Sequence, residues 1–130
     1  MDLRLILAVG IGGAIGSILR YTITYWMQWY HLTVFPLATL LINVVGSLLL
    51  GFLLSFWVAP HHPSGELRVL LTIGFCGGFT TFSTFSYDTV RLMQSGSYGS
   101  AALNVILSVG LSIAAVFAGF AVARAFPTHP

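Results

Sequence analysis

The stretch 74–86 reads Gly-Phe-Cys-Gly-Gly-Phe-Thr-Thr-Phe-Ser-Thr-Phe-Ser, and it lies in the middle of a long apolar run. A glycine in a helix interior costs about 1 kcal/mol relative to alanine. The adjacent pair Gly77-Gly78 therefore predicts a break in a helix here, with carbonyl groups released from the helical ladder. In a bilayer such carbonyls must face protein or a water-filled cavity.

A tandem Thr-Phe-Ser triplet, 81–83 and 84–86, follows the glycines. Its period of three places Phe82 and Phe85 one turn apart on the same helix face, with hydroxyl groups between them. No charged residue occurs in this segment before Asp88. A broken helix that is rich in hydroxyl donors and free of charge indicates a site for a small ion or polar solute.

The composition identifies an integral membrane protein, because 57% of the 130 residues are hydrophobic and only 6% are charged. Soluble domains carry about 25% charged residues. At about 20 residues per span, the length predicts an all-α domain, 1–130, of four transmembrane helices with a retained first span rather than a signal peptide. The single cysteine excludes an intrachain disulfide, and a net charge of +2 does not indicate a nucleic-acid partner. The predicted spans are about 3–27, 35–59, 66–95 and 98–126.

The first span contains Gly12 and Gly16, a GxxxG pattern that predicts close approach of two helices. Arg20 lies near the end of the apolar run, and two interpretations stay open. Its side chain extends to the membrane interface, or it pairs or caps within the protein. The residues after it predict an aromatic belt at the membrane surface: Tyr21, Tyr25, Trp26, Trp29 and Tyr30.

Polar residues recur every four positions in two other spans, so each set shares one helix face. In span 2, Asn43 either forms a helix–helix hydrogen bond or donates into a pathway, and its pattern alone does not decide between them. In span 4, three polar residues in register favour a lined path, although a lone membrane serine usually bonds back to its own helix. The two sets are Thr39, Asn43 and Ser47, and Asn104, Ser108 and Ser112.

Charged residues and histidines are few. Asp88 and Arg91 are three residues apart on span 3 and are predicted to pair. His61 and His62 lie in a proline-flanked turn, which favours a solvated loop over a metal site.

The distribution of the arginines hardly predicts the orientation of the chain in the membrane. One side of the membrane would carry three of them and the other two, whereas topology normally follows a clear Lys/Arg excess. This balance predicts a protein that inserts both ways up. The polar faces of spans 2 to 4 need cover other than lipid, and a second, antiparallel copy of the chain provides it. The two groups are Arg4, Arg68 and Arg124 against Arg20 and Arg91.

The chemistry of the polar residues is that of binding and not of catalysis. The sequence shows no paired-carboxylate site, Cys/His metal cluster, nucleotide loop or nucleophile–base set, so we expect no enzymatic activity. Its membrane donors are neutral amide and hydroxyl groups. The edge of a phenyl ring carries partial positive charge, so Phe82 and Phe85 suit an anion path, the alternative being that they are core packing.

Three segments together resemble the signature of the fluoride channel family called Fluc or CrcB: the run 74–86, Asn43-Val44-Val45-Gly46, and Gly12-Gly13-Ala14-Ile15-Gly16 leading to Arg20. The resemblance covers the whole chain. It implies an antiparallel, dual-topology homodimer in the bacterial inner membrane. Two pores in it would export fluoride passively and so lower fluoride toxicity.

The resemblance also implies roles for individual residues. Asn43 would be a pore-lining donor, and Phe82 and Phe85 the stacked pore phenylalanines. Backbone carbonyls of Gly77 and Thr80 from both subunits would hold a central structural Na⁺. Hydroxyl groups along the anion pathway would come from Ser83, Thr84, Ser108 and Ser112, with Arg20 and Asp88 in structural or pore-mouth positions.

Two positions depart from the family pattern. Asp88 stands where relatives carry a glutamate, and Asn104 where at least one relative has a tyrosine. Either difference bears on conduction rate or pore-mouth geometry.

Two other functions remain as alternatives. A small four-helix, dual-topology multidrug exporter would need a membrane-buried carboxylate. The first span has none after Asp2, and Asp88 lies toward the end of the third. A non-transporting scaffold would use the polar stripes only to join helices.

Overall fold

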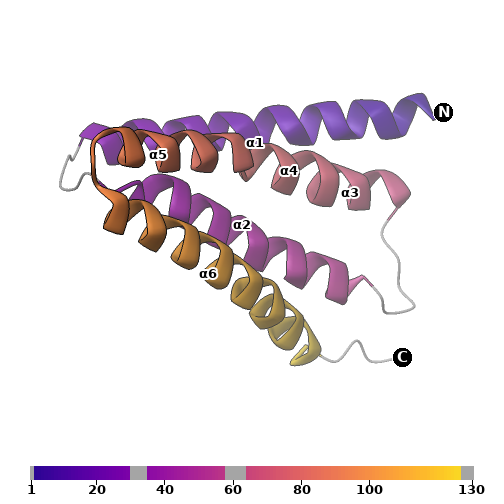
Figure 1. Cartoon of the computed structure of the whole chain (residues 1–130). Helices are drawn as coiled ribbons and strands as arrows, with labels where there is room; N and C mark the ends of the chain where they lie inside the picture. Colours follow the sequence, from indigo (N-terminus) through magenta and orange to yellow (C-terminus); the bar gives the residue numbers. More distant parts are fainter. Residues whose placement is uncertain (1, 30–34, 58–63, 127–130) are drawn as a thin grey trace.

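A computed structural model describes residues 2–29, 35–57 and 64–126, whose only regular elements are helices (Figure 1). Four helical stretches are long and apolar enough to cross a membrane, as expected of an integral, multi-pass membrane protein. Each begins and ends within three residues of its predicted span. The elements are α1 (Leu3–Trp29), α2 (Leu37–Phe56), α3 (Gly65–Val69), η1 (Leu70–Cys76), α4 (Gly77–Phe79), α5 (Phe82–Gln94) and α6 (Tyr98–Arg124).

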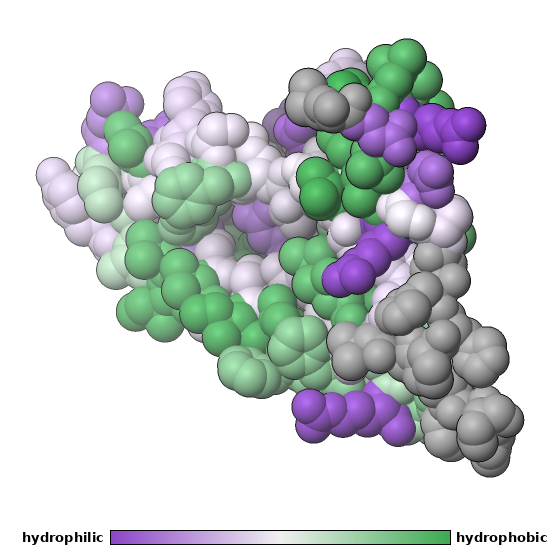
Figure 2. All heavy atoms as spheres, turned by 90° about the vertical axis from the view of Figure 1, so that its right-hand side faces the viewer, coloured by the Kyte–Doolittle hydropathy of each residue, from purple (hydrophilic) through white to green (hydrophobic). Residues whose placement is uncertain are grey.

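The helices form two layers. In one layer α1 runs along η1 and α4, and in the other α2 runs along α6. The start of α1, the start of α3 and the end of α6 lie on the same side of the molecule, and toward that side the two layers diverge (Figure 1). Seen from that side, the molecule is hollowed between the layers, with hydrophobic surface around the hollow (Figure 2).

Glycines form the contact within each layer. A Cβ atom added at Gly12 or Gly16 would collide with backbone atoms of η1 and α4, and one added at Gly51 or Gly119 would collide with backbone atoms across the α2–α6 contact. The close approach predicted from the GxxxG pattern is therefore confirmed. In the other layer the close approach uses one glycine from each helix, Gly51 on α2 and Gly119 on α6.

The third span is interrupted at Thr80 and Thr81 and not at the glycine pair. Both threonines have extended backbone, with φ −78° and ψ 158° at Thr80 and φ −151° and ψ 118° at Thr81. The predicted break at Gly77-Gly78 is therefore wrong in its position, because both glycines are helical. A Cβ atom at Gly78 would collide with the backbone of Gly13, so this glycine is required for packing against α1.

The sequence analysis did not predict the π-helix η1. A π-helix bonds residue i to i+5 and is often found at functional sites. Its residues Thr72 and Cys76 face the groove described next.

Candidate functional site

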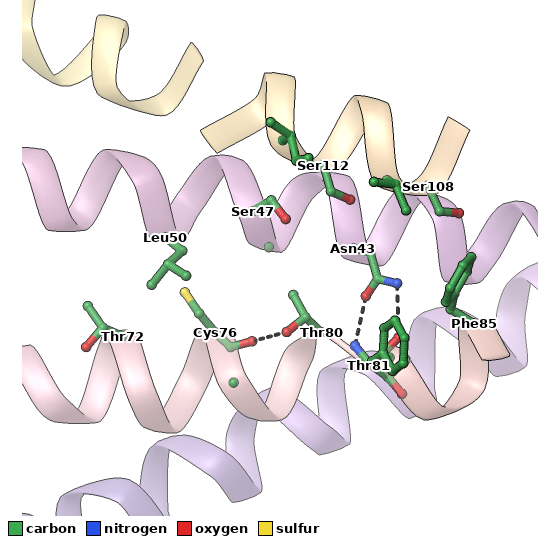
Figure 3. Close-up of a pocket in the computed structure, with 15 residues that line it drawn as sticks. Asn43, Ser47, Leu50, Thr72, Cys76, Thr80, Thr81, Phe85, Ser108 and Ser112 are labelled. Atoms are coloured by element: carbon green, nitrogen blue, oxygen red, sulfur yellow. Dashed lines mark hydrogen bonds between the residues drawn. The ribbon is translucent and has the colours of Figure 1, made fainter. Parts of the chain in front are cut away.

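A groove of about 360 Å³ lies between α2, α6 and the interrupted third span (Figure 3). None of the described residues that line it is Asp, Glu, Lys, Arg or His. Its polar groups are therefore neutral amide, hydroxyl and backbone groups. The residues predicted for the anion pathway that line the groove are Asn43, Phe82, Phe85, Ser108 and Ser112, and Ser47 of the same α2 face as Asn43 also lines it.

Asn43 fastens α2 to the interruption of the third span. Its Oδ1 accepts the backbone N–H of Thr81 at 2.8 Å, and its Nδ2 donates to the Thr81 carbonyl at 3.0 Å (Figure 3). The interpretation of Asn43 as a helix–helix hydrogen bond is thus confirmed. The amide carries a second N–H, so a pore-lining role remains a prediction that this geometry permits.

Thr81 also begins α5. Its Oγ1 accepts the N–H of Thr84 at 3.1 Å as a helix cap. The hydroxyls of Ser83 and Thr84 gather at the same atom, at 3.2 and 3.0 Å. Neither Ser83 nor Thr84 lines the groove, although both were predicted to lie on the anion pathway. The role of Thr81 was not predicted from the sequence, although a threonine is a favoured N-cap residue and its side chain can accept the N–H three positions later, here that of Thr84.

Arg20 caps the helix that ends at the interruption. Its Nε–H donates to the Gly78 carbonyl at 3.1 Å, and the Ser17 hydroxyl donates to the same oxygen at 3.3 Å. A cation near the C-terminal end of a helix is favourable because the last carbonyls carry partial negative charge. Of the two interpretations of Arg20, capping within the protein is therefore confirmed.

The carbonyls of Gly77 and Thr80 are among those that the interruption releases from the helical ladder. In a continuous helix Thr81 N–H would bond the Gly77 carbonyl, but it donates to Asn43. Likewise Thr84 N–H would bond the Thr80 carbonyl, but it donates to Thr81 Oγ1. Both Gly77 and Thr80 line the groove. These are the two residues whose carbonyls were predicted to hold a cation.

The two phenylalanines form a tilted pair, with ring centroids 5.4 Å apart and planes at 47°. Their environments differ, since Phe85 is 9% exposed and Phe82 is 77% exposed. Core packing therefore accounts for Phe85 within one chain but not for Phe82.

Ser108 and Ser112 of α6 differ in their hydrogen bonding. The Ser108 hydroxyl donates to Asn104 Oδ1 at 3.3 Å. The buried Ser112 hydroxyl finds no hydrogen-bond partner within the part of the chain that the structure describes. Ser112 therefore brings an unused donor to the groove.

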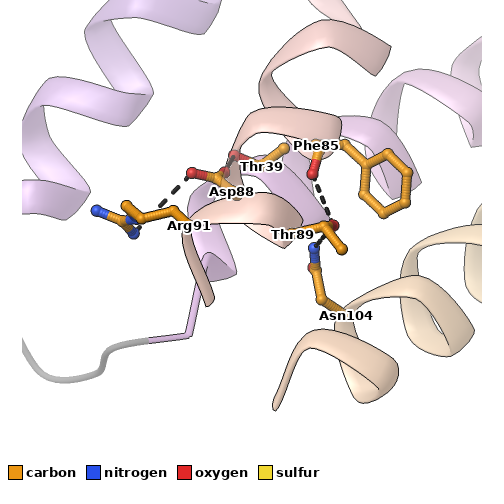
Figure 4. A network of polar contacts seen from close by, with 6 residues as sticks. All are labelled: Thr39, Phe85, Asp88, Thr89, Arg91 and Asn104. Atoms are coloured by element: carbon orange, nitrogen blue, oxygen red, sulfur yellow. Dashed lines mark hydrogen bonds and ion pairs between the residues drawn. The ribbon is translucent and has the colours of Figure 1, made fainter. Parts of the chain in front are cut away.

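Asp88 lies outside the groove lining and joins α5 to α2 (Figure 4). Its Oδ2 accepts the Thr39 hydroxyl at 2.8 Å. Arg91 lies 4.0 Å from its other oxygen, so the predicted pair is confirmed. The carboxylate of Asp88, which is shorter than the glutamate of the family pattern, thus takes part in a buried contact between helices.

The structure describes part of the predicted aromatic belt. The side chains of Tyr21, Tyr25 and Trp26 are exposed, and the rings of the two tyrosines stack at 6.3 Å. Tyr30, the Trp29 side chain and the loop histidines His61 and His62 lie outside the described residues.

Comparison with known proteins places nearly the whole chain among close relatives. Residues 7–120 match the family described as CrcB-like protein, Camphor Resistance (CrcB). A "Fluoride-specific ion channel FluC" of Rhizobium meliloti (strain 1021) is 48% identical over 120 residues, which cover 92% of this chain and 96% of the relative. Proteins of the same name from Geobacter sulfurreducens and Roseiflexus sp. (strain RS-1) are 44% and 43% identical, covering 92% and 94% of this chain and 96% and 98% of each relative.

Proposed function

Because the chain belongs to the CrcB family, we propose that it is a fluoride-selective ion channel. Fluoride leaves the cytoplasm through it passively, which lowers fluoride toxicity. The relatives that carry the name of fluoride-specific channels support this function, and neither the multidrug exporter nor the scaffold receives such support.

The observation that carries the proposal is the neutral lining of the groove. A fixed Lys or Arg side chain would hold any halide, whereas conduction needs binding weak enough to release the ion. Amide and hydroxyl donors, together with phenyl ring edges, favour an anion small enough to approach them closely. Fluoride is the smallest halide and gains most from such contacts.

The residues of the groove have different roles in the passage of the anion. The second N–H of Asn43 and the unused Ser112 hydroxyl are donors for an anion that has lost its water. The rings of Phe82 and Phe85 flank the path and exclude water from it. The hydrogen bonds between Asn43 and Thr81 keep the Asn43 amide in place, so this side chain does not have to reorganise when the ion arrives.

A second, antiparallel copy of the chain completes the pathway in this proposal. The groove holds polar groups that lipid cannot satisfy, and the ring of Phe82 extends from the subunit. Facing copies would cover both, and two copies of the groove would give two pores. The nearly even arginine count supports insertion in both orientations. The relatives' bacterial origins support the cytoplasmic membrane as the location.

We also propose that the Gly77 and Thr80 carbonyls of both copies hold a structural Na⁺ at the dimer axis. The residues fit the ion, because both carbonyls are released from the helix and carbonyl oxygens are good ligands for a monovalent cation. Bound there, the cation would satisfy these oxygens and offset the repulsion between anions passing on either side. The neighbouring Gly78 carbonyl already accepts hydrogen bonds from Arg20 and Ser17, so it does not need the ion.

Flux from liposomes containing the purified protein tests the function. We expect rapid fluoride efflux and far slower chloride efflux, with protein-free liposomes as the control. Comparable rates for the two halides would contradict selectivity, and no flux would favour the scaffold. Proton-coupled uptake of a lipophilic cation, without fluoride flux, would favour the exporter.

A further inference from the structure

Asn104 joins the groove to the helix that carries the phenylalanine pair. Its side chain is 1% exposed and does not line the groove. Its Oδ1 accepts the hydroxyl of Ser108, which does line the groove, at 3.3 Å. Its Nδ2 donates to Thr89 Oγ1 at 2.9 Å on α5 (Figure 4). The Thr89 hydroxyl in turn donates to the Phe85 carbonyl at 2.8 Å.

All protons in this chain of hydrogen bonds point away from the groove. A serine hydroxyl has one proton, and Ser108 uses it on Asn104. In this arrangement Ser108 therefore presents only lone pairs to the groove, which repel an anion. The same side chain was predicted to be a donor on the anion pathway, so its proton must be redirected before it can serve.

A half-turn of the Asn104 amide reverses the chain. The Thr89 hydroxyl then donates to Oδ1, Nδ2 donates to Ser108 Oγ, and the Ser108 proton is released into the groove. The one hydrogen bond lost is that of the Thr89 hydroxyl to the Phe85 carbonyl, which lies in the interior of α5 and keeps its backbone bond from the N–H four residues later. When an anion accepts the Ser108 proton, the number of hydrogen bonds is restored.

We propose that Asn104 is a positioning residue that acts as this amide switch, making Ser108 a donor only when an anion occupies the groove. The inference rests on the proposed function, since it concerns how the same groove handles fluoride. Without an anion, the reversed arrangement has one hydrogen bond fewer and is disfavoured. The rearrangement therefore weakens anion binding at Ser108, as passage requires.

Side-chain amide NMR in lipid bilayers tests the switch directly. The chain contains only two asparagines, Asn43 and Asn104. In a protein labelled with ¹⁵N-asparagine, the side-chain NH₂ signal that disappears in Asn104→Leu belongs to Asn104, and the other belongs to Asn43. We expect fluoride to shift both side-chain NH₂ signals and chloride to shift neither.

Two variants show whether the signal reaches Asn104 through Ser108. In Ser108→Ala, fluoride should still shift the Asn43 signal but no longer that of Asn104. Ser100→Ala, a serine two turns earlier on α6, is the matched control and should keep both responses. A shift of Asn43 alone in the wild-type chain, or an Asn104 shift that persists in Ser108→Ala, overturns the switch and leaves the proposed function standing.

Fluoride flux gives a second test by a double-mutant cycle. Asn104→Leu should lower flux roughly tenfold, because without the amide the Ser108 hydroxyl bonds back to its own helix and its hydrogen bond to the anion is lost. On the Ser108→Ala background it should have no further effect, because its partner is already gone. An equal loss on both backgrounds would make Asn104 a purely structural link. Absence of fluoride flux from the wild-type protein, with no response from either amide, would instead overturn the proposed function and the switch with it.

Discussion

The Asn43 side chain pairs with both backbone polar groups of Thr81, the residue at which the third span is interrupted, at 2.8 and 3.0 Å. An amide side chain thus takes the place of the helical neighbours that Thr81 lacks. One residue on α2 stabilises the interruption and, in the proposed function, presents a donor to the anion.

Replacing Asn43 with Leu should lower both stability and fluoride flux. The substitution leaves the N–H and carbonyl of Thr81 without a partner, and each unsatisfied buried group costs about 1–3 kcal/mol. Thermal unfolding in detergent measures the first effect, and liposome efflux measures the second. Thr22→Val is the control, because it removes an exposed hydroxyl that bonds only to its own helix. Wild-type flux in Asn43→Leu would show that no donor is needed there.

Replacing Phe82 or Phe85 with Ile keeps an apolar side chain but removes the polarised ring edge. We expect a folded protein whose fluoride flux falls about tenfold or more in at least one variant, the upper range for an interaction with an aromatic ring. Phe82 is the more informative position, because its ring is 77% exposed and contributes little to the core. Phe117→Ile, at an exposed ring on α6 outside the groove, is the control. Unchanged flux in both variants would return the pair to packing.

A reporter fused to the C-terminus should be found on both sides of the membrane in the same cells. The arginine count differs by one, three against two, so the two orientations should have nearly equal insertion free energies. Two lysines inserted after Arg124 should direct the chain to one orientation and reduce antiparallel assembly, seen as fewer cross-linked dimers. A wild-type reporter confined to one side would refute dual topology.

Substitutions at Gly77 test the proposed dimer axis separately from the fold of the subunit. A Cβ atom at Gly77 meets nothing within 4 Å in the described chain, so Gly77→Val should leave the subunit folded. We expect it to weaken dimerisation and flux, as should replacing Na⁺ with a bulky organic cation. Thr80→Ser should keep both properties, because the proposed ligand is a backbone carbonyl.

Gly78→Ala provides the contrast, since its Cβ atom would collide with the backbone of Gly13 and should destabilise the subunit itself. Wild-type dimerisation and flux after complete Na⁺ removal would show that water or helix contacts satisfy the carbonyls.

The span limits and the polar faces could be predicted from the sequence because both depend on local periodicity. Hydropathy marks where each apolar stretch begins and ends. Spacing by four places Thr39, Asn43 and Ser47 on one face of α2, and this face does meet the third span through Thr39 and Asn43. The partners of these residues could not be predicted, since they depend on how the helices pack.

The position of the interruption shows where local reasoning failed. Intrinsic propensity favours a break at Gly77-Gly78, but the tight contact between Gly78 and Gly13 keeps that pair helical. The cap at Thr81 and its hydrogen bonds with Asn43, 38 residues away, stabilise the break three positions later. The first of these signals is local and could have been recognised, whereas the second required the fold.

The hydrogen bonds between α5 and α6 could likewise not be predicted from the sequence. Asn104 and Thr89 are 15 residues apart and on different helices, and their bond depends on the turn that joins those helices. The sequence pattern placed Asn104 on the same face as Ser108, which the structure bears out. It gave no indication that the amide connects this face to the Phe85 carbonyl.

The glycine contacts of the two layers limit which substitutions this sequence can accept during evolution. Where two helix backbones touch at a glycine, no larger residue fits, because even the methyl group of alanine would collide with a main-chain atom. The residues without side chains, Gly12, Gly16, Gly51 and Gly119, should therefore tolerate substitution least. Apart from Phe82, the bulky apolar residues on the exposed surface should tolerate replacement by other apolar residues. In this small protein, evolutionary constraint therefore extends to residues that have no side-chain chemistry of their own.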